Sequence, residues 1–249
     1  MVGARDLWTL AIHACSIRYV RITETIPSDE SVAASDPAPS DLTTRARLRD
    51  AAIECFAAEG FGASVRTIAA RAGVSAGLIR HHFGSKDALR AECDAAVLER
   101  HRSLKTEGLE SPANAMAQLA EADEHGAMLV YILRSVQDGS PAGGAFIEHL
   151  IADAVAYSER AVATGILRPS LDPVGRARLL VTNSVGGLLV MLSMHPEIDL
   201  TDFKTVLAKT FEQIALPSIE LYTHGVFADS TYLDQYLQYI RQHPGTEQS

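Results

Sequence analysis

The sequence predicts an all-α fold, and three observations support that prediction. Beyond residue 41, apolar residues recur three and four positions apart, which is the spacing of one face of a helix. Strand-like alternation bounded by turn residues is absent from the same part of the sequence. Serine start signals and glycine stop signals divide about 65 residues into four helices.

The N-terminal segment, residues 1–41, is predicted to be a flexible extension. From Pro27 to Asp41 the chain is rich in Pro, Ser, Asp and Ala, so it can bury too little apolar surface to offset the cost of ordering. We interpret this stretch as a linker. The residues before it fit a short amphipathic helix, a mobile arm or translated sequence upstream of the true start, and these three alternatives stay open.

The first two expected helices follow the linker. An apolar stripe that includes Leu48 and Phe56 predicts a helix that ends at the break formed by Gly60 and Gly62. Ser64 is a suitable N-cap for a short second helix, which stops at a glycine in the C′ position, Gly73.

Two further helices complete this part of the chain. Ser75 caps a third short helix, which is broken at Gly84, and Ser85 starts a longer fourth one. Downstream breaks occur at Gly-Ser-Pro, Arg-Pro and His-Pro sequences near residues 139, 168 and 195. Later helices are expected at about 112–122, 125–137, 142–165, 172–194, 201–216 and 229–243. We divide the chain into an extension (1–41), a first domain (42–90) and a larger helical domain (91–249).

Charge is distributed unevenly along the chain. The net charge of −9 resolves into −2 for residues 1–40, +3 for 41–105 and −10 for 106–249. A mildly basic segment joined to an acidic one is compatible with a DNA-binding part and a part with another task.

Other sequence features bear on the compartment. No apolar run reaches the roughly 18 to 20 residues that span a bilayer, so we expect no membrane partner. Leu7 to Ile17 is the nearest approach to a secretion signal, but His13 interrupts it. Three cysteines without paired spacing suit a reducing cytoplasm.

The stretch from Ser64 to Leu89 has the pattern of a helix-turn-helix. Its tight turn needs a residue that accepts positive φ, which Gly73 supplies, and an apolar side chain under the corner, which Val74 supplies. Small residues, Ala69 and Ala72, let the two helices approach closely. In such a unit the N-terminal end of the second helix enters the major groove.

Polar residues around this turn suit contact with DNA. A second helix that starts Ser75-Ala76-Gly77 leaves its N-terminal amides open to a phosphate. A cation in the first turn of the next helix, Lys86, opposes the helix dipole unless an anion compensates, and a DNA phosphate is such an anion. The residues that we expect to contact DNA are Arg45, Arg47, Arg66, Thr67, Ser75, Ala76, Gly77, Arg80, His81, His82 and Lys86.

Residues 44–90 resemble the DNA-binding domain of the TetR/AcrR family of regulators. Arg80 stands where the family usually has tyrosine, which affects local specificity, and Thr67 replaces a commoner acidic residue, which weakens a capping box with Ser64. The positions that match the family pattern are Phe56, Gly60, Ser64, Val65, Arg66, Ile68, Ala69, Ala72, Gly73, Val74, Ser75, Gly77, His82, Phe83, Lys86 and Leu89.

The resemblance implies a regulator that binds double-stranded operator DNA as a homodimer, most commonly represses, and responds to a small-molecule effector without a cofactor. The family's helical C-terminal domain holds the effector and dimerises through its last two major helices. For the effector we expect Met116, Met128, Tyr131, Phe146, His149, Tyr157 and Asn183, with Leu119 as a further pocket candidate. For the dimer interface we expect Leu179, Asn183, Gly186, Gly187, Val190, Phe203, Leu207 and Phe211.

Some of these assignments have alternatives. A helical glycine costs roughly 1 kcal/mol relative to alanine, so Gly186 and Gly187 indicate a close approach, either to a dimer partner or to another helix of the same chain. A helical carboxylate metalloenzyme is disfavoured because paired Glu-x-x-His elements are missing, and Glu148 and His149 are adjacent instead. A ligand-binding or scaffold protein that has lost DNA binding is disfavoured by Arg80 and Lys86.

Overall fold

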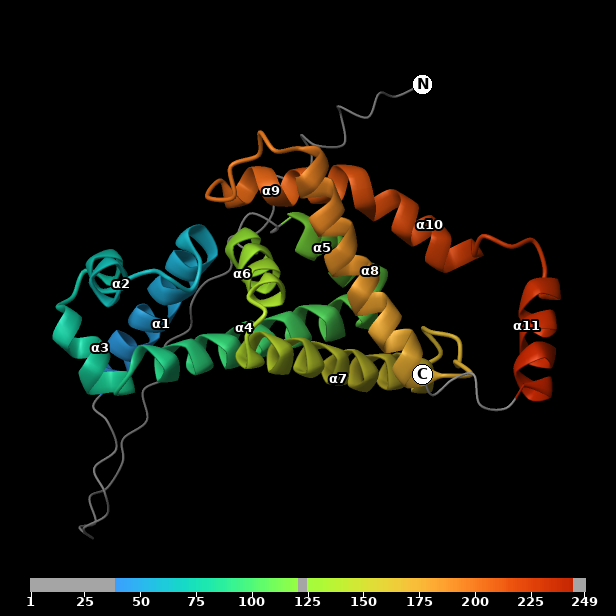
Figure 1. The fold of residues 1–249 in the computed structure, drawn as a ribbon, viewed down its shortest axis with the longest axis horizontal. Coiled ribbons are helices and arrows are strands. Elements are labelled where there is room, and N and C mark those ends of the chain that lie inside the picture. Colours follow the sequence, from blue (N-terminus) through green and yellow to red (C-terminus); the bar gives the residue numbers. More distant parts are fainter. Residues whose placement is uncertain (1–38, 121–124, 244–249) are drawn as a thin grey trace, which may run out of the picture.

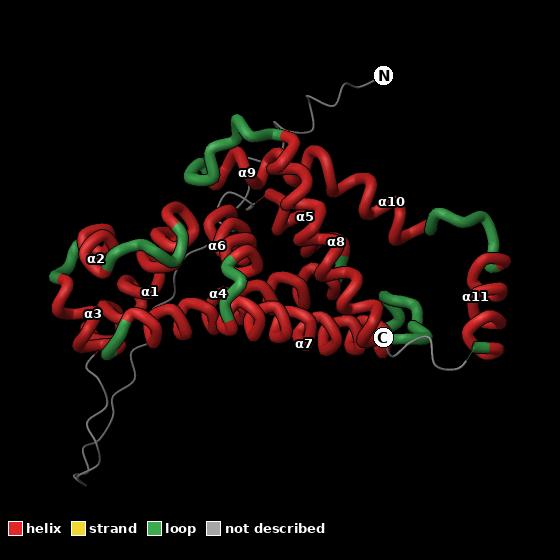
Figure 2. The backbone as a smooth tube through the Cα atoms, viewed as in Figure 1, coloured by secondary structure: helices red, strands yellow, loops and turns green. Residues whose placement is uncertain are grey.

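The computed structural model describes residues 39–120 and 125–243, and every regular element in these ranges is helical (Figures 1 and 2). This confirms the predicted fold class. The alternatives for the N-terminal extension concern residues that lie almost wholly outside the described ranges. The first helix, α1 (Pro39–Glu59), includes the last residues of the predicted linker. Proline is compatible with this position because the first turn of a helix needs no amide donor from it.

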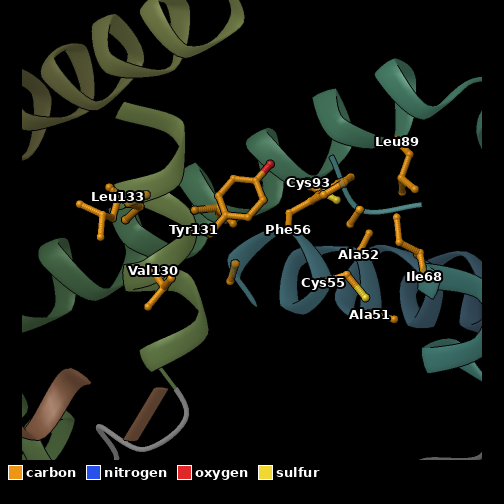
Figure 3. Close-up of a cluster of buried hydrophobic side chains, with 14 of the residues drawn as sticks. Ala51, Ala52, Cys55, Phe56, Ile68, Leu89, Cys93, Val130, Tyr131 and Leu133 are labelled. Carbon is orange, nitrogen blue, oxygen red and sulfur yellow. The ribbon is translucent and has the colours of Figure 1, made fainter. Parts of the chain in front are cut away.

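Four helices form the N-terminal unit, at the blue and cyan end of Figure 1. After α1 come α2 (Val65–Ala72), α3 (Ala76–Phe83) and the start of α4 (Lys86–Glu110). The predicted stripe on α1 is buried, because Leu48, Ala52, Cys55 and Phe56 have no exposed surface. Figure 3 shows Ile68 and Leu89 beside these α1 side chains, which places α2 and α4 against the same core.

The core continues without a break into the C-terminal domain through α6 (Gly126–Gln137). This helix packs against α1, and its Val130 and Tyr131 have no exposed surface (Figure 3). A Cβ added at Gly126 would lie 2.7 Å from the carbonyl carbon of Phe203, so glycine allows α6 and α9 to approach closely. The two domains are therefore joined by packing as well as by the chain.

The longest helix, α4, connects the N-terminal unit to the rest of the molecule. Its 25 residues extend about 37 Å at about 1.5 Å per residue. It packs against α1 and α3 near its start, against α5 (Pro112–Ala120), and along α7 (Pro141–Ala163). A displacement at its far end therefore has a rigid path to the helix-turn-helix.

The next helix, α8 (Pro173–Met194), packs on α7. Among the described helices, α8 is the one long and apolar enough to cross a membrane by length and composition, and only 17% of its most apolar window is buried. The residues in the described ranges leave most of this apolar helix uncovered.

The last part of the chain departs from the sequence prediction. A single helix at 201–216 was expected, but α9 (Phe203–Thr210) continues through a π-helical turn, η2 (Phe211–Ala215), into α10 (Leu216–His224). Pro217 would clash with the carbonyl four residues earlier in a regular helix, and the wider turn directly before it accommodates the ring. A final helix, α11 (Thr231–Gln242), lies near the prediction of 229–243.

Candidate nucleic-acid interface

The turn between α2 and α3 has the geometry that the sequence predicts. Gly73 adopts the left-handed conformation, with φ 68° and ψ 34°. Its amide donates to the carbonyl of Ala70 (3.1 Å), and the Val74 amide donates to that of Ala69 (3.0 Å). These two bonds form a Schellman motif, which ends α2 and turns the chain sharply toward α3.

A side-chain cap fixes the start of α2. Ser64 Oγ accepts a hydrogen bond from the Thr67 amide at 3.1 Å, and the two hydroxyl oxygens lie 2.8 Å apart. Thr67 therefore supports the cap with its hydroxyl, where an acidic side chain would have completed a capping box. The Thr67 hydroxyl therefore has its hydrogen-bond partner, Ser64, within the protein.

One face of α3 is open to solvent. Gly77, Arg80 and His81 are exposed, whereas Ile79 and Phe83 are buried against the core. The N-cap residue Ser75 is also exposed, and its side chain makes no capping hydrogen bond. An approaching phosphate or base can therefore reach the first amides of α3 without displacing a side chain.

Two arginines of α2 and α3 have side chains without a partner among the described residues. Arg66 and Arg80 are exposed, and the side chain of neither forms a hydrogen bond or ion pair with any residue in the described ranges 39–120 and 125–243. Arg71, also on α2, instead pairs with Glu54 at 2.8 Å. The guanidinium groups of Arg66 and Arg80 are therefore available to bind an external anion.

Two other predicted DNA contacts, Arg45 and Arg47, are hydrogen-bonded within the protein. All three nitrogens of Arg45 are occupied: Nε donates to Glu92 at 3.0 Å, and the other two donate to Glu92 and to the carbonyl of His82. Arg47 donates to the carbonyl of Ala72 at 2.6 Å, at the C-terminal end of α2. Both side chains connect α1 to the helix-turn-helix through these hydrogen bonds. In this they differ from Arg66 and Arg80.

The remaining predicted contacts lie around the same end of the unit. Lys86, the first residue of α4, has its ammonium 5.9 Å from the ring centroid of Phe56. His81 and His82 pack edge to face with ring centroids 5.1 Å apart, and His82 is half-buried. Ala76 is also half-buried, so Gly77 and Arg80 present more surface to DNA than their neighbours do.

A polar cluster joins this unit to the C-terminal domain. Arg134 on α6 donates to the carbonyls of Ala57 (3.2 Å) and Ala58 (3.3 Å) near the end of α1. The Arg90 guanidinium lies 3.5 Å from the centroid of the Phe61 ring and 3.0 Å from Asp138. These contacts link α1, α4 and α6.

The residues expected to bind an effector do not gather in one cavity. Tyr131 and Phe146 are fully buried core residues, whereas Met116, His149 and Asn183 are exposed. Tyr157 lines a hollow of about 450 Å³ at the ends of α4 and α7, and Met128 lines another of about 570 Å³ between α1, α4 and α6. Leu119 lies where side chains are not described.

The residues expected at a dimer interface divide into two groups. Phe203 and Leu207 face the core of their own chain, and Gly187 faces Ile214. By contrast, Leu179, Asn183, Val190 and Phe211 are exposed, and Gly186 is partly so. The helix expected from the sequence ends at residue 216, so the prediction misses exposed apolar residues on α10. These are Leu216, Ile219, Leu221 and Tyr222.

Within the described ranges, no group of three His, Cys, Asp or Glu side chains is placed to hold a metal ion. The site consists of the turn at Gly73, the exposed face of α3 and the available side chains of Arg66 and Arg80. This arrangement defines the class of helix-turn-helix DNA-binding proteins with an attached helical domain.

Comparison with known proteins identifies the family. A family model described as bacterial regulatory proteins of the tetR family matches residues 48–93, and a tetracyclin repressor-like C-terminal domain model matches residues 123–228. The HTH-type transcriptional regulatory protein RaaS of Mycobacterium tuberculosis is 40% identical over 205 residues, or 82% of this chain and 96% of that protein. The chain belongs to the TetR family of transcriptional regulators.

The comparisons also found a second curated relative and several solved structures. A Mycobacterium tuberculosis protein named an HTH-type transcriptional repressor is 39% identical over 99 residues, which is 39% of this chain and 49% of the relative. Among solved structures, Salmonella enterica GusR is 25% identical with a TM-score of 0.47, covering 70% of this chain and 96% of that one. A TetR regulator from Chloroflexus aurantiacus is 21% identical with a TM-score of 0.47, covering 72% and 98%.

Proposed function

We propose that the protein is a cytoplasmic, homodimeric repressor that binds operator DNA with α3 and is released by a small-molecule effector. The observation that supports this most strongly is the open face of α3, where Arg80 and the helix N-terminus are uncommitted. Arginine can donate two parallel hydrogen bonds to guanine, which gives base discrimination. Arg66 on α2 supplies a sequence-independent phosphate contact.

The dimer in this proposal forms through α8 and α10. Both helices expose large apolar side chains, such as Val190 (59% exposed) and Leu216 (74% exposed). Exposed large apolar side chains gathered on a helix are typical of an interaction site. A two-fold pairing of this face would present two copies of α3 to successive major grooves, about 34 to 36 Å apart.

The effector in this proposal binds at the hollow between the ends of α4 and α7. Leu109, Tyr157 and Ile166 give it an apolar lining, and Thr106 and Arg160 contribute polar groups. A ligand there would contact the end of α4 remote from the helix-turn-helix. It can shift the regulator only if it binds the operator-competent and incompetent arrangements with different affinity.

The test compares Arg80, whose side chain has no partner among the described residues, with Arg71, whose side chain forms an ion pair with Glu54. Wild type, Arg80→Ala and Arg71→Ala are each used to select duplexes from a randomised DNA library. We expect Arg80→Ala to change the preferred sequence and Arg71→Ala, whose side chain pairs with Glu54, to leave it unchanged. Uniform weakening by Arg80→Ala would make Arg80 a phosphate contact, and failure of folded wild type to select any sequence would contradict the proposed function.

A further inference from the structure

The final helix, α11, stands apart from the other helices at the opposite end of the molecule from α2 and α3 (Figure 1). It follows α10 through residues 225–230, which begin with Gly225 at φ 76°. None of its residues is buried, and no other described helix makes an extended contact with it. A helix of 12 residues is marginal on its own in water, so α11 needs a surface to pack against.

The pattern of α11 defines which side would pack. Tyr232, at 65% exposure, and Tyr236, at 58%, share the apolar side with residues one turn away. The opposite side is polar and includes Gln235 and Gln238. The full apolar set is Tyr232, Leu233, Tyr236, Leu237, Tyr239 and Ile240.

We propose that α11 docks on the second subunit of the dimer and extends the interface formed by α8 and α10. This inference rests on the proposed homodimer. Between α10 and α11, the large apolar side chains of Val226 and Phe227 are also exposed. The rings of Phe227 and Tyr232 stack with centroids 4.6 Å apart, so the loop and the helix present one connected surface.

Charge favours a protein partner over the alternatives. The charged residues of α11 are Asp234 and Arg241, which cancel. Amphipathic helices that bind membranes have polar faces rich in Lys and Arg, and DNA-binding helices carry a basic excess. Tyrosine, which occurs three times in α11, is enriched in protein interfaces because its ring is apolar and its hydroxyl can stay hydrated.

The family comparison places α11 outside the shared domain. The C-terminal family model ends at residue 228, before α11 begins at Thr231. In the proposed dimer α11 makes an additional contact with the second subunit. Because α11 lies far from α3, it can strengthen the dimer without contacting DNA (Figure 1).

The experiment measures dimer dissociation by sedimentation over a dilution series of the full chain. Leu233→Asp combined with Tyr236→Asp places charges on the apolar side of α11. We expect it to raise the dimer dissociation constant at least about tenfold, the equivalent of about 1.4 kcal/mol. The matched control, Gln235→Ala with Gln238→Ala, changes the polar side of the same helix and is expected to alter the constant by less than about twofold.

A second measurement uses a chain that carries no charge substitution on the apolar side of α11. A photo-crosslinker replaces Tyr239 on that side, and the labelled chain is mixed with a chain of different mass; crosslinks to the other chain are expected. Crosslinks confined to one chain, or equal dissociation constants for both variants in an intact dimer, would overturn the role of α11 and leave the α8 and α10 dimer standing. A chain that stays monomeric at every concentration and binds no DNA would overturn the proposed function as well.

Discussion

Replacing Tyr131 by phenylalanine removes one hydroxyl from the junction between the two domains. Tyr131 has no exposed surface, and its hydroxyl donates to Asp94 Oδ1 at 2.6 Å. Phenylalanine keeps the ring, so the contacts with Phe61 (centroids 5.4 Å apart) and Phe146 (6.2 Å) survive. A buried hydrogen bond to a charged group contributes about 1.5–3 kcal/mol, so we expect the free energy of unfolding to fall by about 2 kcal/mol.

The same substitution has a defined pH dependence. Burial raises the pKa of Asp94 above its ordinary value of 3.8, and the Tyr131 hydroxyl opposes that rise. Without the hydroxyl the folded pKa rises further, so the native state retains a proton that the unfolded chain releases. Stability is then lost as the pH rises from 3.8 through the raised folded pKa, and the deficit of the variant is larger at pH 7.5 than at pH 5.

Urea denaturation at a fixed protein concentration measures both effects. Tyr157→Phe on α7 is the control, because the Tyr157 hydroxyl forms no hydrogen bond with any described residue and the expected change is within about 0.5 kcal/mol. Adding Asp94→Asn to each protein should reduce the cost of losing the hydroxyl, since the charged acceptor is gone. An unchanged free energy for Tyr131→Phe, or an equal deficit at both pH values, would refute the role given to this hydrogen bond.

Three further substitutions test the turn, the cation and the domain contact. Gly73→Ala places a side chain at φ 68° and should cost about 1–2 kcal/mol in thermal unfolding; a gain in stability would show that the turn is not strained. Lys86→Ala should weaken binding to all DNA sequences and lower the salt slope by about one, whereas a sequence-dependent loss would contradict a phosphate contact. Gly126→Ala should lower the melting temperature more than Gly144→Ala, because the first new Cβ would overlap the backbone at the start of α9 and the second meets open space; equal shifts would argue against that close approach.

The helix-turn-helix could be predicted because its signals are local. The Ser64 cap and the left-handed Gly73 each act within a few residues, and their pattern stands in the sequence. The buried stripe on α1 follows in the same way from helical spacing. Local chemistry therefore placed the DNA-facing helix and its start.

The remainder depended on contacts between distant parts of the chain. Arg45 and Arg47 look like phosphate ligands in the sequence, but their partners Glu92 and Ala72 lie 47 and 25 residues away. Tyr131 has the pattern of a pocket residue, and only the packing of α6 on α1 shows that it is buried. The path through Pro217 required a π-helical turn, which has no clear sequence signal.

The central claim is that α3 delivers sequence-specific binding by a dimer. The most direct measurement is selection of genomic DNA fragments by the purified full chain at two salt concentrations. We predict enrichment of a near-palindromic site with half-sites about one helical turn apart and a steep loss of affinity at the higher salt. No enrichment at either salt by protein shown to be folded and dimeric would contradict the account.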